Sequence, residues 1–266
     1  MMARLREEIR FIGTLLGINL SSAMAYRASF LTQVVGMFIN NGIYLLFWLI
    51  FFEQFGTVRG YEGADILLLF AVVAVSYGIG LTLAGNISFN LSYLIAQGRL
   101  DYYLVLPRAL LPHIIFSRLQ ASAMGDLIFG SVLFLFTGLW HPVDLLLFVV
   151  VTMLAASLFV SFGIIVGSLA FFMGNAQNVS AQAFNATLTF ALYPNTLFSG
   201  GTRLILYTLL PAAFVGAVPV AVIQERDGLL LLGLAGAALV FMGLATIIFY
   251  RGLRRYESGS AINLNV

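Results

Sequence analysis

The sequence contains no cysteine and only two histidines, His113 and His141, among its 266 residues. Without cysteine the chain cannot form disulfide bonds, thiolate zinc sites or a cysteine nucleophile. The two histidines lie in separate parts of the sequence, so we expect no histidine metal site. No Ser, His and Asp residues with catalytic spacing stand out either. We therefore expect no enzymatic activity from this chain.

Lysine is also absent, so all thirteen basic residues are arginines. The phosphate-binding sequence Gly-x-x-x-x-Gly-Lys-Ser/Thr requires a lysine, and the chain therefore has no ATP site of this kind. The formal net charge is only +2, which does not indicate a nucleic-acid surface. We expect no nucleic-acid partner and no cofactor bound by this chain.

Charged residues are scarce, at 9% of the sequence against about 25% in an ordinary soluble domain. Hydrophobic residues make up 61%. A water-soluble protein of this composition would expose large apolar patches and aggregate. Lipid is the solvent that suits such a sequence, so we predict an all-α integral membrane protein in a lipid bilayer.

Long windows without charge mark the expected membrane spans, because a helix needs roughly 20 apolar residues to cross the hydrocarbon core. The charge-free stretch 145–202 is too long for one crossing, and the polar segment 174–178 divides it in two. The expected spans are therefore 28–52, 66–89, 122–139, the two parts of 145–202, and 228–250.

A seventh apolar segment, 204–224, contains Pro211 and Pro219. Each proline removes a backbone donor and disrupts a continuous helix. We interpret this segment as a re-entrant or broken helical pair on the outer side of the membrane, where protein or water must cover its backbone. Six transmembrane helices then remain.

The arginines give the expected orientation. Three precede the first span and three follow the last, so the positive-inside rule places both termini in the cytoplasm. Only Arg59, Arg203 and Arg226 then lie outside. The expected location is the cytoplasmic membrane, with multiple passes. The expected parts are an amphipathic helix (1–26), a transmembrane domain (27–251) with a cytoplasmic loop (90–118) and a re-entrant segment (203–224), and a cytoplasmic tail (252–266).

The N-terminal segment has one apolar face. Its residues recur at steps of three and four, as on an amphipathic helix: Leu5, Ile9, Ile12, Leu16 and Leu20. We expect this helix to lie at the cytoplasmic interface. The alternative is a simple extension of the first span. Glu7 and Glu8 fit the basic region of a signal peptide poorly.

Polar residues inside the expected spans are the usual candidates for function in a membrane protein. Asp126 is the only acidic one, and it should be protonated, paired or facing water. It is either a structural residue near the cytoplasmic end or part of a path across the membrane. For the amides the alternative is interhelical hydrogen bonding, worth about 0.6 kcal/mol per contact. The candidates for a substrate path are Asn40, Asn41, Asn86, Asp126, Gln182 and Asn185.

The most informative stretch is the cytoplasmic loop. Its sequence predicts a short helix that ends near Gly98, a turn around Asp101 and an extended piece that ends at Pro107. Such a helix, projecting inward between two spans, is well placed to dock on a soluble partner.

The loop pattern resembles that of type 2 ATP-binding-cassette (ABC) exporter permeases, in the six-span bacterial branch encoded with one ATPase and often a second related permease. The residues that carry this resemblance are Ile95-x-x-Gly98-x-Leu100-Asp101-x-x-Leu104-x-x-Pro107. The Tyr193-Pro194 pair, the two later prolines and the sequence 254–258 also fit, so the resemblance covers nearly the whole chain.

The resemblance implies a role for each of these segments. Residues 1–26 would be the connecting helix, and the re-entrant segment would help to close an outer gate at Pro194, Pro211 and Pro219. The coupling segment that contacts the ATPase would contain Leu94, Ile95, Gly98, Arg99, Leu100, Asp101, Leu104 and Pro107.

The resemblance also implies partners and an activity. Two permeases, identical or paralogous, would assemble with two ATPase subunits that bind ATP and Mg²⁺. Together they would export an amphipathic, lipid-like or drug-like substrate by alternating access. Two alternatives stay open: a non-conducting membrane scaffold, and a secondary transporter. The sequence lacks the several intramembrane acids or inverted broken helices that usually mark the latter.

Overall fold

The computed structural model describes residues 2–57 and 60–257, with side chains from residue 6 onward. Arg59, expected on the outer side, and the part of the tail beyond Glu257 lie outside these described residues, as does the Leu5 side chain.

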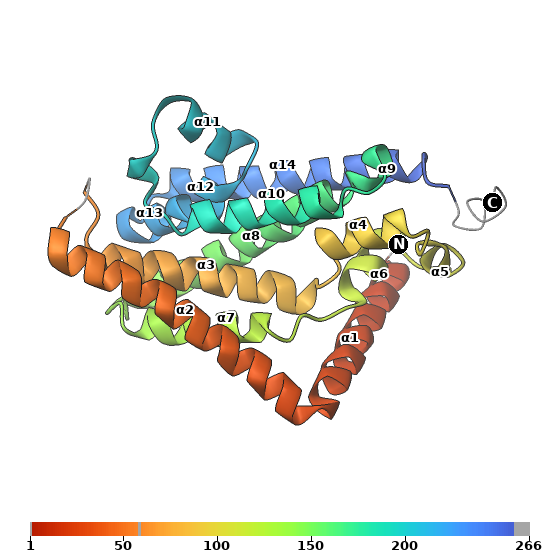
Figure 1. Ribbon diagram of the computed structural model, residues 1–266, viewed down its shortest axis with the longest axis horizontal. Helices are drawn as coiled ribbons and strands as arrows, with labels where there is room; N and C mark the ends of the chain where they lie inside the picture. The colour runs from red at the N-terminus through yellow and green to blue at the C-terminus, as the bar shows by residue number, and fades with distance from the viewer. Residues whose placement is uncertain (1, 58–59, 258–266) are drawn as a thin grey trace.

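All regular elements of the described residues are helices (Figure 1). The longer ones are α1 (Met2–Ala25), α2 (Arg27–Phe55), α3 (Gly63–Leu83), α7 (Ala123–Leu135), α8 (Pro142–Gly167), α10 (Gln177–Ala191) and α14 (Gly228–Leu253). The shorter ones are α4 (Phe89–Ala96), α5 (Asp101–Leu104), α6 (Leu110–Phe116), α9 (Ala170–Met173), the 3-10 helix η1 (Asn195–Leu197), α11 (Gly200–Thr208), α12 (Ala212–Val215) and α13 (Ala217–Glu225).

Four helical stretches are long and apolar enough to cross a membrane: 27–55, 63–83, 142–173 and 228–253. The prediction of an all-helical membrane protein with several passes is confirmed. The other two expected spans are shorter. Helix α7 has 13 residues and α10 has 15, so each is only about 20 Å long against a core of about 30 Å. Six crossings therefore stay a prediction.

Helix α3 forms the centre of the molecule, packed between α7 on one side and α8 on the other. Most of its residues are buried, whereas α2 and α14 lie outside it and bury little of their surface. Large apolar side chains such as Ile39, Phe47 and Leu239 are exposed on these two outer helices. Exposed apolar faces of this kind suit contact with lipid chains.

Glycines allow the central helices to approach closely. A Cβ atom at Gly78 of α3 would lie 2.5 Å from the backbone nitrogen of Leu127 in α7. At Gly130 of α7 it would lie 2.8 Å from the carbonyl oxygen of Ala71 in α3. Gly163 and Gly167 of α8 pack against residues 87–91 in the same way. Small residues at these positions let backbones meet, as in other membrane helix pairs.

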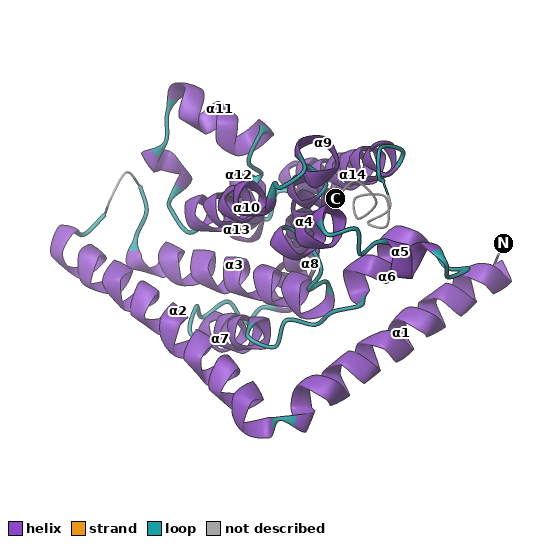
Figure 2. Cartoon of the chain, turned by 45° about the vertical axis from the view of Figure 1, so that its right-hand side comes forward, coloured by secondary structure: helices purple, strands orange, loops and turns teal. Residues whose placement is uncertain are grey.

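The two ends of the molecule differ. The start of α1, the end of α14 and the short helices α4, α5 and α6 gather at one end, and α11 to α13 lie at the other (Figure 1). Helix α1 is separated from α2 by a break at Tyr26 and runs in a different direction (Figure 2). It is thus a separate helix and not an extension of the first span, and its place at the membrane interface stays a prediction.

The face of α1 that meets the protein includes most of the expected one and extends beyond it, since Ile12, Leu16 and Leu20 are partly buried. Ile9 is 63% exposed, whereas Phe11, Leu15 and Asn19 are partly buried. Asn19 donates a hydrogen bond from Nδ2 to the Phe116 carbonyl oxygen of α6, 3.0 Å away. The choice of face therefore follows contacts with α6, which a periodicity on α1 alone does not contain.

His113 of α6 makes a second contact with α1. The Phe11 ring meets the His113 ring edge-on, with centroids 5.0 Å apart. Arg108 lies over the Phe11 ring at 4.8 Å and within 3.7 Å of the Glu8 carboxylate. Burial lowers the pKa of His113 below its usual 6.5, Glu8 opposes this shift and Arg108 adds to it. The neutral imidazole is therefore the form that fits between α1 and α6.

Acidification is expected to loosen α1. Because the pKa of His113 is lower in the docked state, docking is fully stable above about pH 6.5 and weakens below it, by at most tenfold in equilibrium per pH unit. Amide hydrogen exchange in α1, corrected for intrinsic rates, should accelerate between pH 7 and pH 5.5. His113→Phe should remove this acceleration, and His141→Asn should not. An equal acceleration in His113→Phe would assign the effect to another group.

Candidate functional site

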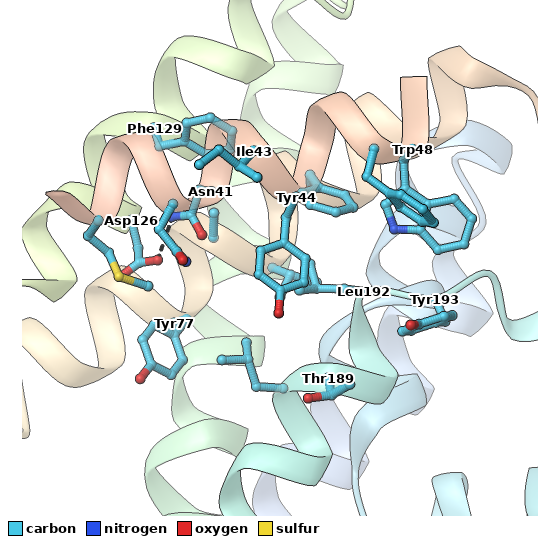
Figure 3. Close-up of a pocket in the computed structure, with 17 residues that line it drawn as sticks. Asn41, Ile43, Tyr44, Trp48, Tyr77, Asp126, Phe129, Thr189, Leu192 and Tyr193 are labelled. Atoms are coloured by element: carbon cyan, nitrogen blue, oxygen red, sulfur yellow. Dashed lines mark hydrogen bonds between the residues drawn. The ribbon is translucent and has the colours of Figure 1, made fainter. Parts of the chain in front are cut away.

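A pocket opens between α2, α3, α7 and the end of α10, with a volume of about 520 Å³ (Figure 3). Three of the six residues predicted for a substrate path line it, and all three were singled out because they are polar within apolar windows. The lining residues are Met37, Asn40, Asn41, Ile43, Tyr44, Phe47, Trp48, Phe70, Val73, Ala74, Tyr77, Asp126, Phe129, Leu188, Thr189, Leu192 and Tyr193.

Asp126 and Asn41 meet in the wall of this pocket. Asn41 donates a hydrogen bond from Nδ2 to Oδ1 of Asp126 across 2.7 Å, although the two residues are 85 positions apart (Figure 3). The neighbouring Gly125 makes this contact possible, because its missing side chain lets α7 lie directly against the backbone of α2 at Val34. The structure thus pairs two residues that the sequence identified separately.

The second carboxylate oxygen of Asp126 has no hydrogen-bond partner among the described residues, although the residue is only 4% exposed. No arginine of the described residues forms an ion pair with it. Arg118, the arginine that precedes α7, donates to the side-chain oxygen of Asn90 at 3.1 Å. Asp126 is therefore a buried acid in the wall of the pocket, held by one amide.

Aromatic rings supply much of the remaining wall. Tyr44, Phe47 and Trp48 come from successive turns of α2, and Tyr77 comes from α3. Trp48 also meets Tyr193 edge-on at 5.3 Å, which joins α2 to the segment after α10. Sequence reasoning missed these rings as site residues, because aromatic residues are 14% of the chain and lie throughout the apolar windows. Only their proximity to Asp126 distinguishes them.

The other three path candidates lie elsewhere. Asn86 is buried and donates to the Ile114 carbonyl oxygen at 3.1 Å and to Ser117 Oγ at 2.7 Å. Those bonds fit the structural alternative for this residue. Gln182 and Asn185 are exposed on α10 outside the pocket. With Asn178 and Thr189 they form a polar stripe at steps of four, three and four residues, and its last member lines the pocket.

The predicted coupling segment separates into two groups. Ile95 and Leu100 are buried and hold the loop in place, whereas Arg99, Leu104 and Pro107 are exposed. Leu94 and Asp101 are intermediate, and Gly98 has the positive φ of +65° that ends α4. Asp101 begins the helical turn α5 in place of the expected simple turn.

The most exposed apolar residues of this loop were not among the predicted coupling residues. Tyr102 is 77% exposed and Val105 80%, and Leu106 is also exposed beside them. We call Tyr102, Leu104, Val105 and Leu106 the α5 tip. The signal that could have found it is the run Leu104-Val105-Leu106 directly before Pro107, since apolar residues in a polar loop rarely point to water without a partner.

The end of the chain supports this loop. Burial and the neighbouring Asp101 carboxylate raise the pKa of Tyr256 to about 12, so the phenol stays protonated beside that acid. The Tyr256 ring also meets Phe171 edge-on at 6.2 Å. The start of α5 and the residues after α14 are therefore in contact at the end of the molecule that also holds α1.

The outer-gate prolines all lie at breaks or first turns. Pro194 precedes η1, Pro211 precedes α12, and Pro219 lies in the first turn of α13, where a proline is tolerated. They divide the segment after α10 into the short helices expected of a broken pair. Its re-entrance into a membrane stays a prediction. Among residues 2–57 and 60–257, no cluster of His, Cys, Asp and Glu side chains could hold a metal ion.

The comparison with known families agrees with this arrangement. The family model described as ABC-2 family transporter protein matches residues 38–260, from the middle of α2 to beyond the end of α14. No curated protein and no solved structure matches the sequence. The family match covers far more than half of the chain and agrees with the resemblance of its cytoplasmic loop. The chain belongs to the ABC-2 family of membrane transporter proteins.

Proposed function

We propose that this chain is the permease subunit of an ATP-driven exporter that works as a pair of permeases, identical or paralogous, with two ATPase subunits. ATP and Mg²⁺ would bind to those partners. The family supports a transport subunit that is not itself the catalytic ATPase. The observation that carries the proposal is the α5 tip, an exposed apolar surface on the loop between two membrane segments.

The position of the α5 tip favours a cytoplasmic protein partner. It lies at the end of the molecule where α1 begins and α14 ends, and the basic residues Arg99, Arg108 and Arg251 belong to the same end. The positive-inside rule makes that end cytoplasmic. Apolar side chains in an aqueous compartment are stabilised when a partner covers them, and a docked ATPase subunit would do so.

The proposed membrane topology uses α7 and α10 as two further crossings beside the four long stretches. Helix α7 is apolar and packs along α3, and α10 packs along α8. Both therefore lie against helices that are long enough to cross. The short helices α11 to α13 would then lie at the outer end, opposite the α5 tip. This arrangement gives six crossings with both termini in the cytoplasm.

The proposed path runs through the pocket and along α10. Closure of the ATPase dimer would move the α5 tip, and the buried Ile95 and Leu100 would transmit that movement to α4 and the central helices. Because packed helices shift between discrete arrangements, the pocket would open alternately to the two sides. Its apolar and aromatic lining favours an amphipathic substrate.

Charges placed on the α5 tip are expected to release the ATPase. In Val105→Asp/Leu106→Asp, two carboxylates would have to be buried in the docking surface, so co-purified ATPase should fall roughly tenfold or more. Gln97→Asp is the control, because it adds a carboxylate to an exposed position of the same loop outside the tip. The measurement is ATP hydrolysis and subunit stoichiometry of the complex purified in mild detergent.

The outcomes separate the alternatives. Loss of the ATPase from the tip variant alone, with an unchanged elution volume of the permease, supports the proposal. If that variant retains the ATPase, the docking surface lies outside the α5 tip. If no ATP-hydrolysing subunit accompanies the wild-type chain under conditions that preserve other complexes, the exporter proposal fails and the scaffold and the secondary carrier replace it.

A further inference from the structure

The Asp126 carboxylate lacks a counter-charge. An acidic side chain inside a membrane segment is costly unless it is paired or faces water. Here one oxygen accepts from Asn41, and the other oxygen has no partner among the described residues. Asp126 lines the pocket, and its unpaired oxygen is buried in the pocket wall. A ligand that brings a positive charge would complete the pair.

The rest of the lining favours a cation over an anion. Among the residues that line the pocket, Asp126 is the only acidic one, and no arginine or histidine is present. The rings of Tyr44, Trp48, Tyr77 and Tyr193 face the same space (Figure 3). Aromatic faces attract cations within about 6 Å, most strongly where water is excluded.

The pocket is too apolar for an inorganic cation. Ca²⁺ takes six to eight oxygen ligands and Mg²⁺ takes an octahedral set, whereas this wall offers one carboxylate and a few amides and hydroxyls. The volume of about 520 Å³ lies within the range of about 300–1,000 Å³ that is typical of small-molecule sites. An organic cation with bulky apolar groups fits both the charge and the lining.

Access from the lipid is also open. Ile43, Tyr44 and Phe47 line the pocket, and each is more than half exposed on the outer surface of α2. The rim of the pocket therefore reaches the face that meets lipid chains. A ligand that partitions into the bilayer could enter beside α2 without first crossing an aqueous vestibule.

We propose that this pocket binds an amphipathic organic cation, with the Asp126 carboxylate as its counter-charge, Asn41 as the residue that positions the carboxylate, and the aromatic rings as the surface for its apolar groups. This inference deepens the proposed function, since it names the class of substrate that the same pocket would take. Binding to the isolated permease tests it without the ATPase.

The test uses two probes of nearly the same shape and opposite charge, tetraphenylphosphonium and tetraphenylborate. The chain has two tryptophans, and Trp140→Phe leaves Trp48 in the pocket wall as the single fluorescent tryptophan. This variant is reconstituted in lipid nanodiscs and titrated with each probe, with empty nanodiscs as the blank. Saturable change of Trp48 fluorescence is expected with the cation and not with the anion.

Asp126→Asn in the same background is expected to weaken binding of the cation at least about 30-fold, because the buried counter-charge is lost while the shape and the Asn41 contact remain. Asp126→Glu should recover part of the affinity. Asp227→Asn is the matched control. It removes a carboxylate from the outer end, where asparagine caps α14 equally well, and should leave binding unchanged.

Equal saturable binding of the anion would overturn the inference. So would an unchanged affinity for the cation in the Asp126→Asn variant, provided that this variant elutes at the same volume as the wild type. Absence of any saturable binding to the wild type would overturn it too, and a proton-carrying or purely structural role for Asp126 would then replace it. Co-purification of the ATPase is measured in a separate experiment, so failure of the cation-binding proposal is distinguishable from failure of the exporter proposal.

Discussion

Gly78→Leu is expected to prevent correct folding of the chain. Even a Cβ atom at this position would lie 2.5 Å from the backbone nitrogen and 2.7 Å from the Cα atom of Leu127, so α3 and α7 would have to separate. Backbone atoms cannot rotate away as a side chain can. A leucine adds three further carbon atoms to a contact that already has no space, and separation of the helices would also disturb the wall that holds Asp126.

A graded series makes this prediction quantitative. Gly78→Ala should lower the free energy of unfolding by about 3 kcal/mol, at the upper end of the usual range for overpacked cores. Gly78→Leu should elute as aggregate. Gly243→Ala in α14 is the control, because a Cβ atom there meets nothing within 4 Å. The measurement is the fraction that stays monodisperse in size-exclusion chromatography after heating. If Gly78→Ala tolerates heat as well as Gly243→Ala, the close approach of α3 and α7 is wrong.

The positions of the first and last long helices could be predicted, because charged residues flank their apolar windows. The expected first and last spans agree with α2 and α14 to within a few residues, and the polar segment 174–178 separates α8 and α9 from α10 as expected. The lengths of α7 and α10 could not be predicted. Their ends are set by turns against neighbouring helices, and composition does not change there.

The residues of the pocket could be predicted only in part. Asn41 and Asp126 stand out as polar residues in apolar windows, yet their hydrogen bond joins positions 85 apart and depends on the close approach at Gly125. A single sequence contains no information on that approach. Conversely, Asn86 stands out equally and is occupied with α6, so polarity alone does not separate a site residue from a structural one.

The same limit applies to the loop 90–118, which was predicted to be cytoplasmic. Its apolar residues share one pattern in the sequence, but Leu100 is fully buried and Val105 is exposed. Leu100 directly precedes the helical turn α5 and belongs to the buried apolar core, whereas Val105 directly follows that turn. The residues carried over from the family resemblance therefore include both those that hold the loop and those that present its surface.

The end of the molecule that holds α11 to α13 has its own point of attachment, where α13 turns into α14. Arg226 donates two hydrogen bonds to Asp144, from Nε at 2.9 Å and from an Nη at 3.0 Å. Asp144 is buried in the first turn of α8, where the helix dipole favours an anion. Its hydrogen bonds and its charge raise the pKa of Arg226, so the pair stays ionised. Nearby, Gln224 donates to Asp65 of α3 at 2.6 Å.

Arg226→Met is expected to detach this outer segment. It leaves the Asp144 carboxylate buried without its cation, and the segment would have to open to hydrate it. Amide exchange at the end of α13 and the start of α14 should accelerate roughly tenfold or more. The exchange rate in Arg226→Lys should fall between those of the wild type and Arg226→Met, because lysine keeps the charge but cannot donate the two parallel hydrogen bonds of the guanidinium. Arg203→Met, which removes an outer arginine stacked on Tyr207, should leave exchange in this region unchanged.

The order of the Arg226 variants decides what the ion pair does. If exchange increases from wild type through Arg226→Lys to Arg226→Met, the two hydrogen bonds hold α13 and α14 against α8. If both variants match the wild type, the hydrogen bond from Gln224 to Asp65 and the apolar contacts of α13 suffice. In the proposed exporter this end would open, so its contacts must be able to break. If the Arg226–Asp144 contact is the one that breaks, transport should change most in Arg226→Met, because the segment α11 to α13 would open there without ATP hydrolysis.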